Sequence, residues 1–198
     1  MKLKVVQAGD PVLRRVGRTL TVDEIKGESL QYLIALMRET MRDAPGVGLA
    51  APQIGESLQL AVIEDRPEYI ATFTPEQLAE LQRTAVDFHV IINPKISLLG
   101  DSHPEFFEGC LSVTGFGALV RRAGHVRVEC LNERAEPVTL DAHGWYARIL
   151  QHEIDHLNGT MYIDRMETRS LTTAENLSRF WRNHTVERVR SELEITEK

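Results

Sequence analysis

The feature that most constrains this chain is the stretch at residues 151–157, Q-H-E-I-D-H-L, which contains the pattern H-E-x-x-H. On an α-helix, residues four positions apart lie on one face, so His152 and His156 can direct both imidazoles at a single metal ion. Glu153 could then reach a water molecule at that metal without being a ligand. This spacing is typical of metal-dependent hydrolases. Two surface histidines that share a helix face by chance are the alternative.

The predicted helix that carries this pattern, residues 144–158, is apolar around most of its circumference. Trp145 and Ile149 fall on the stripe of the two histidines, and further apolar residues occupy the neighbouring stripe. Such a helix should be buried. A glutamate and two histidines in a buried helix need a partner, because an unpaired buried charge is costly. A metal ion would provide one. Gly159 suits the position just after the helix end.

The other periodic segments predict an α+β fold in which antiparallel β-sheets pack around this central, buried, metal-binding helix. β-rich runs occur at residues 58–64, 88–92, 95–99, 118–122, 125–132 and 137–141, with a hairpin turn at 132–136. Helical patterns occur at residues 23–42, in a polar excursion at 65–83 that starts a short helix at Thr74-Pro75, and at 173–193. With 198 residues, we expect a single catalytic domain over 1–198 whose residues 173–198 form a C-terminal helix and tail.

Charge and apolar content narrow the class of partner and the compartment. The net charge of −6 argues against a surface built to grip DNA, and we expect no DNA partner. No apolar run approaches the roughly 20 residues that span a bilayer, so we expect no membrane association. The first residues resemble neither a signal peptide nor a transit peptide. We therefore expect a cytoplasmic protein, with a bacterial source favoured and a processed organellar enzyme as the alternative.

A catalytic metal site of this kind normally has three protein ligands, so the two histidines need a third. Upstream, the stretch E-G-C-L-S at residues 108–112 offers the thiolate of Cys110 in a tight turn with a glycine. Downstream, Glu175 lies at a tolerable distance and would make the chain an H-E-x-x-H zinc metalloprotease. A non-catalytic module with a structural zinc is a further alternative, although such a site normally has a fourth protein ligand.

Three motifs together resemble those of the peptide deformylase family, in the same order and spacing. They are G-V-G-L-A-A-P-Q at residues 46–53, E-G-C-L-S at 108–112 and Q-H-E-I-D-H-L at 151–157. The resemblance extends from about residue 9 to residue 166. The excursion at 65–83, Gly115-Phe116 and the stretch before the third motif are similar to the type 1A, mitochondrial and plastid branch. The family fold, antiparallel sheets around a central metal helix, agrees with the predicted elements.

The resemblance implies a hydrolase that removes the formyl group from the N-terminal formyl-methionine of nascent polypeptides and releases formate. Cys110, His152 and His156 would bind one divalent metal, and Glu153 would act as general base and then acid. The metal would be Fe(II), with Zn, Ni or Co able to occupy the site, because cysteine and histidine suit several metals. The five remaining histidines are expected to be non-catalytic: His89, His103, His125, His143 and His184.

The resemblance also implies how the substrate is held. The Gln53 side-chain amide and the Leu111 backbone N–H would stabilise the oxyanion. The backbone of Gly48 would bind an extended peptide, and an apolar pocket would take the methionine side chain, with a lining that includes Val47, Trp145 and Ile149. Glu108 and Arg122 are candidates for supporting the ligands, or are solvated surface charges.

Two features bear on partners beyond the methionine. Gly117 stands where many family members have an arginine near the substrate cleft, so the resemblance does not determine how the peptide backbone beyond the methionine is recognised. The basic residues of the predicted C-terminal helix indicate a ribosome contact or a solvated helix face: Arg179, Arg182, Arg188 and Arg190.

Overall fold

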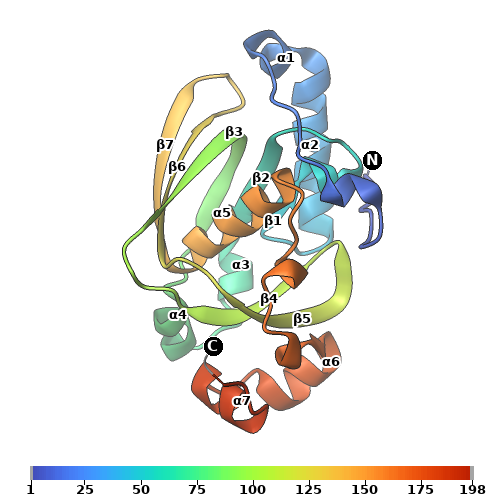
Figure 1. The fold of residues 1–198 in the computed structure, drawn as a ribbon. Helices are drawn as coiled ribbons and strands as arrows, with labels where there is room; N and C mark the ends of the chain where they lie inside the picture. The colour runs from blue at the N-terminus through green and yellow to red at the C-terminus, as the bar shows by residue number, and fades with distance from the viewer. Residues whose placement is uncertain (1, 197–198) are drawn as a thin grey trace.

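The structure is a computed structural model, and it describes residues 2–196. Two antiparallel sheets meet at one long helix, α5 (Gly144–Leu157). Figure 1 shows α5 in the centre, the larger sheet on one side of it, β4 and β5 below it and the C-terminal helices at the lower end. The predicted fold class is therefore confirmed. Within residues 2–196, no helix has the length and apolar character needed to cross a membrane.

The larger sheet has five strands in the order β1-β2-β3-β6-β7. These strands are β1 (Gly48–Ala50), β2 (Leu60–Asp65), β3 (Val86–Leu99), β6 (His125–Leu131) and β7 (Pro137–His143). Side chains alternate between its two faces. In β2, Ala61 and Ile63 pack with Leu150 of α5, whereas Leu60 and Val62 belong to a second apolar cluster on the opposite face. The sheet is thus covered on both faces.

The second apolar cluster contains the helix α2 (Glu28–Asp43), which contributes Met37 and Met41. The sequence predicts one helix from residue 23 to 42, but the structure breaks it at Gly27 into α1 (Val22–Lys26) and α2. Thr21 and Glu24 form a complete capping box on α1, so a separate short helix starts there. The predicted end of the helix before residues 44–46 is confirmed.

The smaller sheet has the order β4-β5-β8 and supplies the cysteine of the second motif. Its strands are β4 (Glu105–Cys110), β5 (Val113–Arg121) and β8 (Thr172–Thr173). The sequence reading of residues 108–112 as only a tight turn was incomplete, because Cys110 is the last residue of a strand and the turn follows it. The predicted break at residues 93–94 was also wrong, since β3 runs through it with a register shift.

Two segments outside the sheets contain several short helices. The excursion after β2 holds α3 (Pro67–Ile70) and α4 (Pro75–Leu81), and α4 has the predicted cap at Thr74. The predicted continuous helix at 173–193 is instead three pieces: α6 (Ala174–Asn176), the π-helix η5 (Leu177–Trp181) and α7 (Val186–Glu192). Thr185 starts α7 with a new side-chain cap, which separates it from η5.

The N-terminal segment joins distant parts of the chain by backbone hydrogen bonds. Ala8 N–H donates to the carbonyl of Ser112 at 2.7 Å, and Gly17 N–H donates to the carbonyl of Leu157 at 2.9 Å. The second bond satisfies a carbonyl at the end of α5 that has no partner within the helix. Gly159, just beyond, has φ of 72°, as its predicted position requires. Because the Val6 N–H also donates to the carbonyl of Gln53 at 2.9 Å, this segment contacts residues of the first motif, the second motif and the metal helix. The remaining short helices are η1 (Pro11–Arg14), η2 (Ala51–Ile54), η3 (Tyr162–Asp164) and η4 (Thr168–Ser170).

Candidate active site

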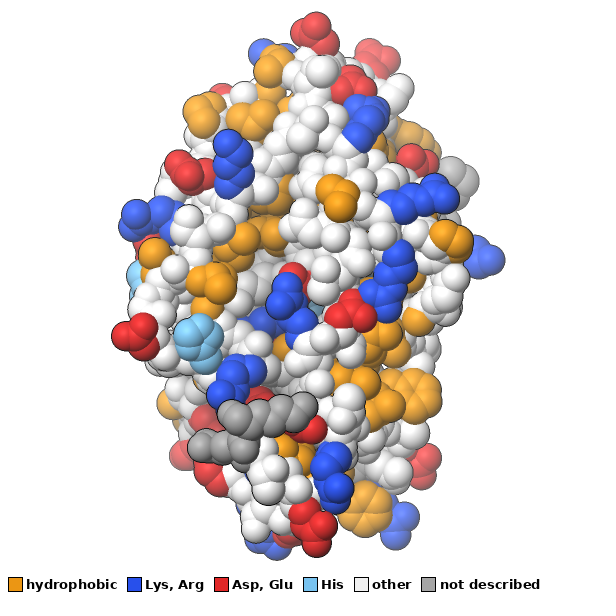
Figure 2. Space-filling model, viewed as in Figure 1, with side chains coloured by type: hydrophobic (Ala, Val, Ile, Leu, Met, Phe, Trp, Pro, Cys, Tyr) orange, Lys and Arg blue, Asp and Glu red, His pale blue; other side chains and the backbone are white. Residues whose placement is uncertain are grey.

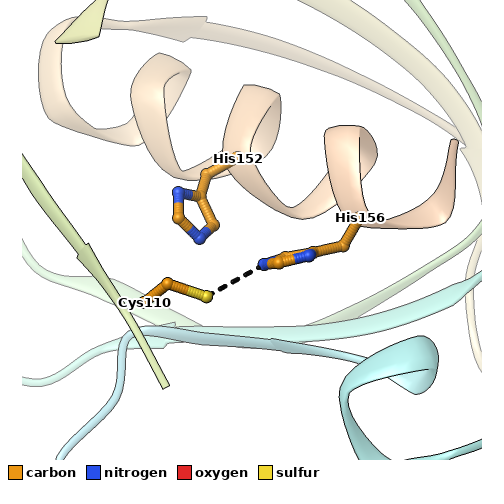
Figure 3. A group of neighbouring side chains, drawn as sticks. All are labelled: Cys110, His152 and His156. Atoms are coloured by element: carbon orange, nitrogen blue, oxygen red, sulfur yellow. Dashed lines mark hydrogen bonds between the residues drawn. The ribbon is translucent and has the colours of Figure 1, made fainter. Parts of the chain in front are cut away.

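The three predicted metal ligands face one another between β4 and α5 (Figure 3). One ligand atom from each of Cys110, His152 and His156 lies within 4.8 Å of the other two. Cys110 Sγ is 3.2 Å from His156 Nε2. In a tetrahedral site with metal bonds of about 2.3 Å to sulfur and about 2.1 Å to nitrogen, these two atoms would stand about 3.6 Å apart. The donor set and its spacing therefore fit a single divalent metal ion.

His152 is oriented by a buried carboxylate. Its Nδ1 lies 3.0 Å from Glu108 Oε2, which leaves Nε2 to face the cysteine. Burial alone would raise the pKa of Glu108, but hydrogen bonds from His152 and Arg122 hold that pKa well below its usual range. Burial likewise opposes a charge on His152, yet its hydrogen bonds with Cys110 and Glu108 raise its pKa. Glu108 thus remains a carboxylate and fixes the imidazole ring.

Glu108 is in turn held by two buried arginines. Arg122 donates from Nε and Nη2 to its two oxygens, both at 2.9 Å, and Arg148 donates from Nη1 at 2.6 Å. The third nitrogen of Arg122 reaches Asp155 Oδ2 at 2.5 Å, and Asp155 also accepts two bonds from Arg165. The assignment of Glu108 and Arg122 to ligand support is therefore favoured over solvated charge. Arg148 was not predicted, although an arginine inside an apolar helix is itself a signal for a buried acid.

Glu153 occupies a crowded, buried position beside Gly48. A Cβ atom on residue 48 would lie 2.2 Å from Glu153 Oε1, so only glycine leaves room for this carboxylate. Burial raises the pKa of Glu153 to about 7. Among the residues that the structure describes, Glu153 Oε2 is a buried oxygen without a hydrogen-bond partner. A carboxyl group in this state is suited to accept and return a proton near neutral pH.

Gln53 and Leu111 lie next to the cysteine. Gln53 Oε1 accepts from the backbone N–H of Ala50 at 2.8 Å, which directs Nε2 towards Cys110 Sγ and Ser112 Oγ, each at 3.4 Å. Both predicted oxyanion residues line the cavity beside the ligands. The side-chain amide therefore directs its donor towards the predicted cysteine ligand beside the cavity.

That cavity has a volume of about 380 Å³ and is lined by all four predicted substrate-binding residues: Val47, Gly48, Trp145 and Ile149. His152, Glu153 and Cys110 line it as well. Phe107, Phe116 and Ala174 also line the cavity, although the sequence did not predict this. Phe107 belongs to the strand that was not predicted, and Ala174 comes from the C-terminal segment, whose position depends on tertiary packing.

The alternative third ligand is not brought to the site. Glu175 is an exposed residue of α6. Within residues 2–196, two groups bring three possible ligand atoms within 4.8 Å of one another, and Glu175 belongs to neither. The second group is His125, Asp141 and His143 on the β6–β7 hairpin, for which the sequence showed no ligand spacing because the three meet across strands.

A helix with H-E-x-x-H, accompanied by a cysteine and facing a cavity, is an arrangement typical of metal-dependent hydrolases. The chain belongs to the polypeptide deformylase family, whose model matches residues 2–171. It is 47% identical to the chloroplastic peptide deformylase 1A of Solanum lycopersicum over 87% of this chain and 62% of that protein. It is 39% identical to the mitochondrial peptide deformylase of Homo sapiens over 85% of this chain and 69% of that protein.

These matches confirm the resemblance to the type 1A branch. The chain covers 62% of the length of the tomato 1A protein and 65% of that of the Arabidopsis thaliana 1A protein, which is less than two thirds of each. Among solved structures, it is similar to a Met-Ala-Ser-bound class I type b peptide deformylase from Acinetobacter baumannii. That match has a TM-score of 0.75 and 31% identity, and covers 84% of this chain and 99% of the other. The Thermotoga maritima peptide deformylase matches with a TM-score of 0.69 and 34% identity over 84% and 99% of the two chains.

Proposed function

We propose that this protein removes the N-formyl group from formyl-methionine at the start of nascent polypeptides and releases formate. The observation that carries the proposal is the convergence of Cys110, His152 and His156 next to a cavity that Cys110, His152 and Glu153 line. The Met-Ala-Ser peptide named with the Acinetobacter baumannii structure supports the same substrate class, because it begins with methionine.

Cys110, His152 and His156 would hold one divalent metal ion. When bound, the metal supplies Lewis acidity, which lowers the pKa of water and polarises the formyl carbonyl. We propose Fe(II) as the native metal, as the family resemblance implies, although the Cys-His-His donor set alone would also suit zinc, nickel or cobalt. Protein purified without oxygen should then contain iron and release formate faster than air-exposed protein. Equal activity, with zinc found by elemental analysis, would contradict iron.

Glu153 carries the proton transfers. It takes a proton from the attacking water as the water oxygen bonds to the formyl carbon, and it delivers a proton to the amine nitrogen as the C–N bond breaks. The carbonyl oxygen becomes negatively charged between these steps. Gln53 Nε2 and the Leu111 N–H would donate to it, each contributing on the order of 3 kcal/mol to the transition state.

The cavity would bind the substrate through its first residue. Val47, Trp145 and Ile149 offer an apolar surface to the methionine side chain, and removing that side chain from water favours binding. The backbone of Gly48, at the start of an edge strand, is available to pair with an extended peptide.

The decisive assay measures formate release from a formyl-methionine peptide, with the acetyl-methionine peptide as control and metal analysis of the same sample. We expect formate from the first peptide alone. Glu153→Ala should abolish release while the metal content stays near one per chain, and His143→Asn, on the exposed hairpin, should change neither. Formate release by a metal-loaded Glu153→Ala protein would overturn the general-base assignment.

We propose that the protein acts where formylated chains emerge, in a bacterial cytoplasm in preference to an organelle. The relatives include chloroplastic, mitochondrial and bacterial proteins.

A ribosome contact would use the C-terminal arginines. Two of these already pair within the chain, Arg188 with Glu192 and Arg190 with Glu105. Basic and acidic side chains are interspersed on the face drawn in Figure 2. Ribosome co-sedimentation that is unchanged when residues 173–198 are removed would refute this contact.

A further inference from the structure

The β6–β7 hairpin places four polar side chains on one face. His125 of β6 lies directly opposite His143 of β7, and Arg127 lies opposite Asp141. Because side chains two apart in a strand point to the same side, these four residues share a face, and the buried residues between them belong to the core on the other side. β7 is an edge strand, at the opposite end of the larger sheet from β1 (Figure 1). The face that carries these side chains is therefore well away from the edge strand of the candidate active site.

Two imidazole nitrogens on this face converge on one carboxylate oxygen. His125 Nε2 lies 2.7 Å and His143 Nε2 lies 3.4 Å from Asp141 Oδ1. The two rings stack, with their centroids 3.9 Å apart and their planes inclined by 19°, so they approach the oxygen side by side. One ligand atom from each of the three residues lies within 4.8 Å of the other two. Two nitrogens directed at one oxygen are the arrangement that a shared cation would bind.

The donor set and its spacing suit a divalent transition-metal ion. Bonds of about 2.1 Å to imidazole nitrogen and to carboxylate oxygen place two donor atoms about 3.0 Å apart at octahedral angles and about 3.4 Å apart at tetrahedral angles. The two Nε2–Oδ1 distances lie close to this range, so small rotations of exposed side chains would admit an ion. Two imidazoles and one carboxylate suit zinc, nickel, cobalt or copper, whereas magnesium and calcium prefer oxygen ligands alone.

Arg127 limits how tightly such an ion can be held. It donates to Asp141 Oδ2 at 2.9 Å, which keeps Oδ1 turned towards the two imidazoles. As a cation on the same carboxylate, it also repels an incoming ion. The three ligand side chains are 32% to 62% exposed, so water competes for the ion. An ion on this face should therefore exchange readily, whereas the ion of the candidate active site should stay bound during purification.

We propose that His125, Asp141 and His143 form a second, exchangeable binding site for a divalent transition-metal ion. This site is independent of the function proposed above. Its remaining coordination positions would be filled by water, because the cluster supplies three ligand atoms. His143 is also the residue from which α5 starts, so an ion here would tie the beginning of that helix to β6. Binding to the folded protein should therefore raise the midpoint of thermal unfolding.

The test is equilibrium dialysis of nickel-loaded, full-length protein against free Ni²⁺. Using one metal for both sites avoids exchange between unlike ions. The unaltered protein should bind two ions per chain, the second with a Kd between about 1 μM and about 1 mM, and desalting should return it to one. A single ion per chain at about 1 mM free Ni²⁺ would overturn the proposal.

Variants locate the second ion. His143→Asn should weaken its binding more than about tenfold and leave the first ion in place. His103→Asn changes an exposed histidine outside the cluster, so both ions should remain. Cys110→Ala should show the opposite pattern and bind only the exchangeable ion. A second ion with the same Kd in His143→Asn, or one lost equally in His103→Asn, would be adventitious binding and would overturn the proposal.

Thermal unfolding gives an independent readout. Added Ni²⁺ should raise the unfolding midpoint of the nickel-loaded protein and of His103→Asn, because the ion binds the folded state. The rise should be absent in His143→Asn. A rise of equal size in all three proteins would place the stabilising ion elsewhere and would overturn the proposal.

Discussion

Two clusters in this molecule each bring three potential metal ligands together, but they differ in how deeply they are buried and in how their polar atoms are hydrogen-bonded. Cys110, His152 and His156 lie between β4 and α5, where His156 is 1% exposed. The second cluster, on the β6–β7 hairpin, has side chains that are 32% to 62% exposed, and it joins the two stacked rings of His125 and His143 to Asp141.

The difference lies in how the polar atoms are satisfied. In the hairpin cluster, Asp141 accepts from Arg127 at 2.9 Å and contacts His125 at 2.7 Å, and these contacts lower the pKa of Asp141. In the central cluster, Glu153 Oε2 and His156 Nδ1 are buried and have no hydrogen-bond partner among residues 2–196. Native proteins rarely leave such atoms unpaired without a function. Unsatisfied buried groups beside a cavity therefore identify a site better than the convergence of ligands does.

Removing one ligand from each cluster should give the largest contrast. Cys110→Ala should lose its bound metal and reduce formate release by more than about a hundredfold, the upper range for residues that only support a ligand. His125→Ala should keep both near the values of the unaltered protein. Elemental analysis and the formate assay on the same samples decide this. Metal lost equally from both variants would make the two clusters equivalent and would break the comparison.

Neutralising the central acid of each cluster should separate buried from exposed charge. Glu108→Gln leaves Arg122 and Arg148 without their carboxylate, so the free energy of unfolding of metal-free protein should fall by about 3–5 kcal/mol. Asp141→Asn should produce little measurable change, because its partners stay in water. Urea unfolding of both variants at neutral pH measures this. Similar losses would show that burial does not govern these networks.

Adding a single methyl group tests how closely the central cluster is packed. Gly48→Ala places a carbon where Glu153 Oε1 now lies, so we expect the carboxylate to move and the rate to fall about a hundredfold. The metal content should remain, because none of the three ligands contacts residue 48 in this way. The formate assay measures the rate of the variant, and elemental analysis measures its metal content. A variant with full activity would mean that the carboxylate has another productive position.

The smallest effect is expected for Glu64, whose burial lies between that of Glu108 and that of Asp141. Its contribution to the free energy of unfolding should depend on pH. Hydrogen bonds from Arg42 to Glu64, both at 2.6 Å, lower the pKa of Glu64, although burial opposes this. A folded-state pKa below the unfolded value stabilises the protein above about pH 4.3, and that contribution is lost as the pH falls through the folded pKa. Arg42 is 37% exposed, so we expect only about 1 kcal/mol.

Urea unfolding of the unaltered protein and Glu64→Gln at pH 7 and at pH 3 would measure the pH effect. The difference between the two proteins should be present at pH 7 and shrink at pH 3. A difference that is the same at both values would indicate that Glu64 contributes through packing and not through charge.

The sequence predicts the central helix well, because that helix depends on a local pattern, whereas the predicted lining of the cavity came from the family resemblance. The four-residue spacing of His152 and His156 is a property of one helix, and the glycines around Val47 mark a close approach of backbone. Cys110 was one of two possible third ligands from the residues alone, and the family resemblance distinguished it from Glu175. That resemblance also supplied Gln53 and Leu111.

What the sequence could not predict depends on contacts between distant segments. The strand β4 was overlooked because glycine and the following turn obscure its alternation. The break between η5 and α7 depends on how Trp181 and Val186 pack against the buried cluster that also receives Phe107 of that strand. The hairpin cluster needs the register that places His125 opposite His143. Periodicity along the chain contains no information about such pairings.

The hydrogen bonds of the N-terminal segment have a consequence for how the chain folds. Gly17 is joined to Leu157, and Ala8 to Ser112, so these two residues find their partners only after most of the chain up to those positions exists. Contacts this distant along the sequence slow folding, because a large loop must close before they form. During synthesis, Ala8 and Gly17 therefore lack these two partners for longer than Val6 and Arg18, which bond with Gln53 and with Ser57. The protein should gain its structure late, in a step that requires residues 144–157 to be complete.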